Sequence, residues 1–228
     1  MVSFLFILLS FFYVRDIMSL QDLKSKYNIS SVFIKSKDEV DLWKSDAISA
    51  IEKIKILSEF SKDNGAIHAD VGAIQTGLNA GSILLIQFFE TMADIEKVYD
   101  KMPTQPVYEE LFSTGNMELT GRGIARILHR ESVSSVDPKY MVLTKFSSEN
   151  EMLDEAKKVM GIFMANGALS CGYATIGAGN SVGDRLMGVR YPSLDAIQKA
   201  YEAVREDADY KSALSSAELH SRNILRLA

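Results

Sequence analysis

The chain is poor in the residues that form disulfides and metal sites. Its 228 residues include a single cysteine, Cys171, and three histidines. One cysteine cannot form an intramolecular disulfide, and such a chain is typical of a reducing compartment, so we expect a cytoplasmic protein. The histidines and the cysteine show neither HExxH nor CxxC spacing. We therefore expect no metal site and no bound cofactor.

The chain also lacks clustered positive charge. It has 25 Lys and Arg against 30 Asp and Glu, and a net charge of −5. Nucleic-acid binding needs a basic face. Arginines such as Arg122, Arg126 and Arg130 are instead spread along one segment. This pattern argues against a nucleic-acid partner.

No apolar run is long enough for a spanning helix. The longest, Val2–Val14, has 13 residues, whereas a spanning helix needs about 20. It also lacks the basic start and small-residue cleavage site of a signal peptide. We prefer the interpretation that translation starts at Met18 rather than Met1. The alternative is that residues 1–17 form a genuine membrane anchor, which is the only membrane contact we expect.

What the sequence does contain is an internal repeat of residues 65–126 in residues 167–226. The numbers differ by 102, and by 100 after a two-residue deletion. The aligned pairs are Gly65/Gly167, Ile74/Ile176, Gly77/Gly179, Gly81/Gly183, Ile95/Ile197, Tyr99/Tyr201, Tyr108/Tyr210, Glu118/Glu218 and Arg122/Arg222. A period near 100 residues is too long for a solenoid and indicates a duplicated small domain.

Each half is predicted to run strand, helix, strand, strand, helix, strand. Apolar residues at helical or alternating spacing set these assignments. In the first half we predict strands at 32–35, 66–75, 82–89 and 118–128, with helices at 37–62 and 92–102. In the second half we predict strands at 140–146, 169–176, 185–191 and 218–227, a helix capped by Ser148, a helix opening at Pro192-Ser193, and an irregular stretch at 206–216.

The order βαββαβ is that of a ferredoxin-like unit, which carries helices on one face of its sheet. The other face must be covered, and a second unit can cover it. We therefore predict an α+β fold in which two ferredoxin-like repeats pack sheet to sheet. The expected organisation is a lead-in at 1–30, a repeat at 31–130, a linker at 131–139 and a repeat at 140–228.

The topology, the repeat and the motif GDRLMGVRYPSLDAIQKAY resemble the dimeric α/β-barrel superfamily, which includes the antibiotic-biosynthesis monooxygenases. The resemblance covers about residues 30–228. It implies that the usual homodimer is fused here into one intramolecular barrel. It also implies a cofactor-independent monooxygenase or isomerase that acts on a small molecule, and a tendency to form homo-oligomers.

The candidate catalytic residues are His68 and Asp70, which lie two apart on one face of a predicted strand. A His–Asp pair can act as a general base with its orienting carboxylate. Side chains at this spacing are about 7 Å apart, so a purely structural pair is the alternative. The pair occurs in only one half, as a single asymmetric site requires.

The candidate ligand-binding residues lie on the last strand of each half. Strand alternation puts charged side chains on one face and small residues, such as Gly121 and Gly123, on the other. We expect the small-residue face under the helices and the charged face between the two sheets, where it can bind a small organic or anionic metabolite. The residues are Glu118, Arg122, Glu218, His220 and Arg222. The alternative is that they form ion pairs between the sheets.

Other conspicuous residues have simpler interpretations. Trp43 lies on the apolar stripe of a predicted helix, and Cys171 is expected to be a buried, inert thiol. The segment GAGNSVGD recurs in the first half as a hairpin turn, so we do not interpret it as a dinucleotide site. Three functions remain open: an oxygenase or isomerase, a non-catalytic binder of a small metabolite, and a structural or assembly protein with a packed barrel interior.

Overall fold

The structure is a computed structural model that describes residues 28–36, 45–112, 117–133 and 136–228. The N-terminal apolar run and Trp43 lie outside these residues, so the interpretations made for them stay predictions. Within the described part of the chain, no helix is both long enough and apolar enough to cross a membrane.

The two halves contain the same succession of elements. The first half comprises β1 (Asn28–Ser36), α1 (Ser45–Asp63), β2 (His68–Ile74), β3 (Ile83–Phe89), α2 (Met92–Lys101), α3 (Pro106–Phe112) and β4 (Met117–Ser132). The second half comprises β5 (Tyr140–Ser147), α4 (Leu153–Ala165), β6 (Ser170–Ala178), β7 (Arg185–Tyr191), α5 (Leu194–Glu206), α6 (Ala208–Ser215) and β8 (Glu218–Leu227).

Three local predictions are wrong. The stretch 206–216 contains helix α6, whose N-terminus is capped by the Asp207 carboxylate accepting from the Tyr210 amide. Ser148 does not cap α4, because its hydroxyl donates to the Asn150 carbonyl and the helix begins only at Leu153. Two strands are also longer than predicted, since β1 begins at Asn28 rather than at residue 32 and β4 ends at Ser132 rather than at residue 128.

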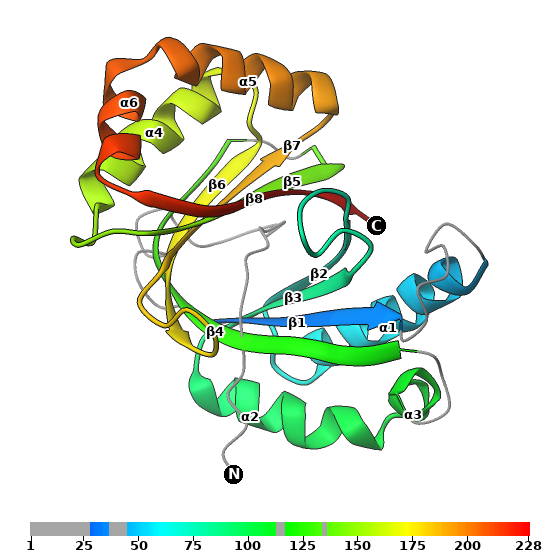
Figure 1. Cartoon of the computed structure of the whole chain (residues 1–228). Coiled ribbons are helices and arrows are strands. Elements are labelled where there is room, and N and C mark those ends of the chain that lie inside the picture. The colour runs from blue at the N-terminus through cyan, green and yellow to red at the C-terminus, as the bar shows by residue number, and fades with distance from the viewer. Residues whose placement is uncertain (1–27, 37–44, 113–116, 134–135) are drawn as a thin grey trace.

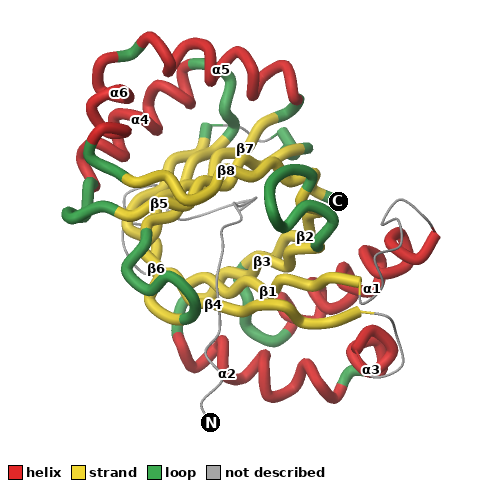
Figure 2. The backbone as a smooth tube through the Cα atoms, viewed as in Figure 1, coloured by secondary structure: helices red, strands yellow, loops and turns green. Residues whose placement is uncertain are grey.

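The eight strands form one closed antiparallel barrel in the order β1-β3-β2-β8-β5-β7-β6-β4. Within each half the order is last strand, first, third, second. Helices α1, α2 and α3 lie outside one side of the barrel and α4, α5 and α6 outside the opposite side (Figures 1 and 2). The chain thus has a mixed α/β fold built around an eight-stranded barrel, and each strand has one face toward the interior and one toward the helices.

The two seams between the halves differ in length. β4 pairs with β6 from Ile124 to Ser132, whereas β2 pairs with β8 only from Gly72 to Ile74. The β2–β3 turn extends the short seam. The Gln75 amide donates to the Ile224 carbonyl, and the Ile224 amide donates to the Thr76 hydroxyl, each over 2.8 Å.

The repeated glycines are explained by backbone conformation. Gly77 and Gly179 have φ of 84° and 112°, and Gly81 and Gly183 have φ of 88° and 95°. Both pairs lie in the turns that join β2 to β3 and β6 to β7, as predicted. L-residues rarely adopt this left-handed region, so the same turn requires glycine in both halves.

Gly77→Ala is expected to destabilise the protein more than Gly183→Ala. Both replacements place a side chain at positive φ, which costs about 1–2 kcal/mol. At Gly77 the new Cβ would also lie 2.1 Å from Oδ1 of Asn223, whereas at Gly183 it meets nothing within 4 Å. Urea unfolding of the two variants measures the difference, and equal losses of stability would contradict this account of the β2–β3 turn.

Candidate functional site

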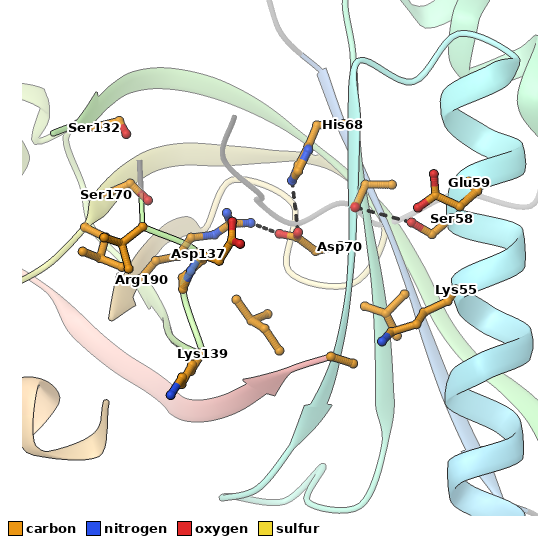
Figure 3. A pocket seen from close by; sticks show the side chains of 17 residues that line it. Lys55, Ser58, Glu59, His68, Asp70, Ser132, Asp137, Lys139, Ser170 and Arg190 are labelled. Atoms are coloured by element: carbon orange, nitrogen blue, oxygen red, sulfur yellow. Dashed lines mark hydrogen bonds and ion pairs between the residues drawn. The ribbon is translucent and has the colours of Figure 1, made fainter. Parts of the chain in front are cut away.

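A cavity of about 530 Å³ lies at one end of the barrel, beside the short β2–β8 seam. Its walls come from α1, the start of β2, the segment 136–139, the start of β6 and the end of β7 (Figure 3). Both halves and their connection therefore contribute to it.

A chain of three polar side chains lines this cavity. His68 Nε2 lies 3.0 Å from Asp70 Oδ1, and the other carboxylate oxygen forms an ion pair with the Arg190 guanidinium (Figure 3). The Asp70 side chain is 17% exposed and that of Arg190 only 3%. The ion pair thus joins β2 of the first half to β7 of the second, with its guanidinium buried and its carboxylate partly exposed to the cavity.

Strand register explains why these residues meet. His68 and Asp70 lie opposite Phe88 and Ile86 of β3, on the interior face of β2. Arg190 lies on the interior face of β7, opposite Met141 of β5. Strand spacing alone left direct contact between His68 and Asp70 open, and the structure shows it.

His68 is electrically neutral in this setting. Burial, followed by the charges of Arg190, Lys62 and Arg130, lowers the pKa of its imidazole to about 3. A carboxylate only accepts hydrogen bonds, so the Nε2–H of the neutral ring donates to Asp70 and Nδ1 carries the lone pair. Burial also lowers the pKa of Arg190 to about 9, which leaves the guanidinium charged at neutral pH.

The outer wall of the cavity carries both signs of charge. Lys55 and Glu59 come from α1, and Asp137 and Lys139 from the segment before β5 (Figure 3). Three serine side chains add hydroxyl groups: Ser58, Ser132 and Ser170. This lining suits a small polar ligand rather than a purely apolar one.

A second, smaller cavity of about 60 Å³ lies between the sheet and helices of the second half, and its lining is mostly apolar. Arg222 is the one cationic side chain among the residues that line this cavity. The guanidinium donates to the Tyr210 hydroxyl over 3.0 Å and to Thr144 Oγ1 over 3.4 Å. It also lies over the Tyr201 ring, 4.8 Å from the centroid.

The first half repeats the arginine and the tyrosines in a different environment. Arg122 donates to the Tyr108 hydroxyl over 3.2 Å and lies 5.2 Å from the centroid of the Tyr99 ring. The Tyr99 hydroxyl bonds to Ser30 and Gln87.

Gln87 in turn donates to Ser61 in α1. The offset of 102 places Val189 at the position of Gln87 and Phe163 at that of Ser61. The second half therefore has apolar side chains where the first has a hydrogen-bond network.

The predicted direction of the charged strand face is wrong. Arg122 and Arg222 point toward the helices, where they meet tyrosines of α2, α3, α5 and α6. Strand alternation then turns the face with Gly121 and Gly123 toward the barrel interior. The physical reason is that each arginine stacks on one tyrosine and donates to another, which satisfies its charge beneath the helices.

The seven predicted site residues do not form one pocket. His68 and Asp70 line the barrel-end cavity, and Arg222 lines the smaller one. Glu118 and Glu218 are exposed and line neither. His220 Nε2 lies 3.6 Å from Asp184 Oδ2, away from both cavities.

Sequence reasoning missed Arg190, Tyr201 and Tyr210 as site residues. In the sequence, Tyr201 and Tyr210 stand out only as members of the repeat. Arg190 had a usable signal, because it alternates with Leu186 and Gly188 and is therefore the one charged residue on that face of its strand. Cys171 is buried, and burial raises the pKa of its thiol, as expected for an inert cysteine.

The fold is shared with solved structures. A candidate monooxygenase from Fusobacterium nucleatum is 10% identical, with a TM-score of 0.57 over 88% of this chain and 91% of that one. A mutant chlorite dismutase from Candidatus Nitrospira defluvii is 8% identical, with a TM-score of 0.56 over 90% and 91%. A heme-binding protein from Thermus thermophilus is 8% identical, with a TM-score of 0.55 over 89% and 91%. At these identities the likeness is one of fold alone.

The described residues do not fit a heme. A porphyrin needs a broad apolar slot with an axial ligand. The apolar cavity here holds about 60 Å³ and no histidine lines it, while the larger cavity has a mixed polar and apolar lining and its histidine donates to Asp70. Over the described ranges, no group of three or more His, Cys, Asp or Glu side chains is placed to hold a metal ion.

Sequence comparison gives a family without a known activity. No curated protein matches the sequence. One family profile matches it twice, over residues 42–127 and 138–227, with one match in each half. The chain therefore belongs to the family described as Domain of unknown function (DUF6854).

Proposed function

We propose that the protein binds a small organic or anionic metabolite in the barrel-end cavity, where His68, Asp70 and Arg190 position it. One observation carries this proposal: a chain of three polar side chains, drawn from both halves and partly to fully buried, lines a cavity of about 530 Å³. Polar groups that converge in a cavity and include a strongly shifted pKa are typical of functional sites.

Two finer points complete the proposal. The chain consists of two ferredoxin-like repeats, 31–130 and 140–228, joined by 131–139 into one intramolecular barrel. The identical strand order of the halves and the two profile matches support this organisation. If the ligand is a substrate, His68 acts as its base with Asp70 as the orienting carboxylate, in a cofactor-independent monooxygenase or isomerase reaction. The fold it shares with a candidate monooxygenase supports that class.

The test is ligand binding to the full chain, followed at the imidazole of His68 by NMR. A panel of small carboxylic acids, phenols and amino acids is titrated into the parent protein and into His68→Gln. We expect at least one compound to shift the His68 resonances and to raise the melting temperature. If no compound does either, the proposed site is wrong, and the structural or assembly role becomes the better explanation.

The smaller cavity is a second candidate, favoured by the asymmetry between the halves. In the first half, Gln87 and Ser61 form a hydrogen-bond network beside Tyr99. The corresponding positions of the second half are Val189 and Phe163, which are apolar. An apolar ligand with one acidic group would suit this cavity, with Arg222 as its anchor. A compound bound there loses affinity in Arg222→Met and keeps it in the matched variant Arg122→Met.

A further inference from the structure

Three side chains that line the smaller cavity are smaller than their counterparts in the first half. The correspondence is set by the helices, because α1 and α4 end at equivalent residues and Asn64 and Asn166 each donate to the carbonyl four positions earlier. The offset of 102 then pairs the following side chains: Ala156 with Ile54, Val159 with Leu57, and Ala213 with Leu111. In the first half all three are at most 2% exposed. The first half therefore fills with hydrocarbon the space that the second half leaves open.

The other walls of this cavity are mostly apolar and largely aromatic. Phe146, Phe163 and Tyr201 line it. Leu214 and Leu219 line it as well and are 42% and 46% exposed, so its opening is apolar too. A volume of about 60 Å³ admits about four to six waters, or one apolar body about the size of a ring. Most of this lining gives water no polar partner, so an apolar body suits it better.

Met152 stands at the start of α4 in a backbone conformation that residues other than glycine rarely adopt. Its φ is 55° and its ψ is 31°, and its side chain lines the cavity. The carbonyls of the two preceding residues, Asn150 and Glu151, accept from Arg185 and Tyr173 and hold this segment in place. Backbone strain of this kind is concentrated at ligand-binding sites, which agrees with a ligand site at this cavity.

Arg222 brings a positive charge to this lining without an anionic partner among the described residues. Its guanidinium group has five N–H donors. One donates to the Tyr210 hydroxyl and one to Thr144 Oγ1, and no carboxylate of the described ranges pairs with it. Arginine binds a carboxylate most strongly through two parallel hydrogen bonds. A carboxylate in the cavity would therefore supply the negative charge that the protein itself does not.

We propose that the smaller cavity binds a monocarboxylate whose apolar body is a single aromatic ring. The ring packs against Phe146 and Phe163, in the space beside Ala156 and Ala213, because aromatic rings pack well edge to face or offset against one another. The carboxylate accepts from Arg222. This inference rests on the second candidate function given above and names its ligand class, independently of the barrel-end cavity. The first half has the corresponding arginine and tyrosines but no room, so the second half is the binding unit.

The probe is benzoate, and benzamide is its uncharged counterpart of nearly the same shape. Binding to the full-length protein is measured by isothermal titration calorimetry. We expect benzoate to bind at least about tenfold more tightly than benzamide, because only the anion forms charge-assisted hydrogen bonds to Arg222. Arg222→Met is expected to abolish this preference, and Arg122→Met, which changes the filled half, to retain it.

A second variant tests the space itself. Ala156→Ile combined with Ala213→Leu copies the packing of the first half into the second. We expect this double variant to bind benzoate no longer, while its melting temperature stays at or above that of the parent, because the added carbons fill a cavity. Should the double variant unfold at a lower temperature than the parent, Ala213→Leu alone is measured in the same way.

Other results would overturn the inference. Equal affinities of the parent for benzoate and benzamide would show that Arg222 does not pair with the carboxylate. If hexanoate binds where benzoate does not, and the double variant excludes it, the cavity remains a site and the aromatic class is wrong. Undiminished benzoate binding in the double variant would place the ligand elsewhere and refute the second candidate function as well. Absence of binding by all three compounds would refute both in the same way.

Discussion

Asp70→Asn is expected to lower the free energy of unfolding by about 3–5 kcal/mol, the usual effect of removing one partner of a buried ion pair. The substitution leaves the Arg190 guanidinium charged, 3% exposed and without its carboxylate. It also leaves a single acceptor oxygen, the amide Oδ1, where the carboxylate offered one oxygen to His68 and the other to Arg190. Because this ion pair connects β2 to β7, the loss falls on the contact between the two halves. Urea unfolding measures the effect.

Two comparisons separate this effect from the loss of any surface charge. Asp209→Asn removes an ion pair with Lys158 in which both side chains are more than half exposed, and it should cost at most about 1 kcal/mol. Replacing both partners, as Asp70→Leu with Arg190→Met, should restore much of the stability, because no buried charge is then left unpaired. If Asp70→Asn costs no more than Asp209→Asn, the ion pair does not hold the halves together.

Acidification below pH 6.5 is expected to destabilise the parent protein partly through His68. Its pKa is about 3 when folded and about 6.5 when unfolded. Between these values the unfolded chain binds a proton that the folded protein rejects. The stabilising contribution is therefore complete above pH 6.5 and is lost as pH falls toward 3. The slope approaches about 1.4 kcal/mol per pH unit.

His68→Gln removes the titratable imidazole and should therefore weaken the dependence of the free energy of unfolding on pH. Between pH 6.5 and 4.5 we expect the variant to lose about 2 kcal/mol less stability than the parent. Urea unfolding at several pH values measures the difference, and His220→Gln serves as the matched loss of an exposed imidazole. Parallel curves for His68→Gln and the parent would show that His68 binds a proton as readily in the folded protein as in the unfolded chain.

Much of the architecture could be predicted, because it depends on local patterns that occur twice. The βαββαβ order follows from apolar periodicity, and the turn glycines were found because Gly77 and Gly179 need the same left-handed backbone. The helix opening at Ser193 was also predicted, and its hydroxyl accepts from the Ala196 amide. The helix α6 was missed because its stability depends on packing Tyr210 under Arg222, which the sequence around it does not reveal.

The candidate site could be predicted only in part. The spacing of His68 and Asp70 placed both on one strand face, since strand alternation is a local property. The third side chain of this polar chain, Arg190, lies 120 positions after Asp70 in the sequence. It reaches Asp70 only because the barrel closes, and no pattern near either residue predicts the pairing.

The sequence by itself determined most of the order of elements and the side chains available for chemistry, because each depends on residues close together in the chain. The tertiary structure decided which face of each strand is interior, and it separated His68 and Asp70 from Arg222. It also left a cavity at one barrel end, beside the short pairing of β2 with β8. These outcomes depend on register and closure between segments far apart in the sequence, such as β2 and β8, where the free energy of packing and not local preference selects the arrangement.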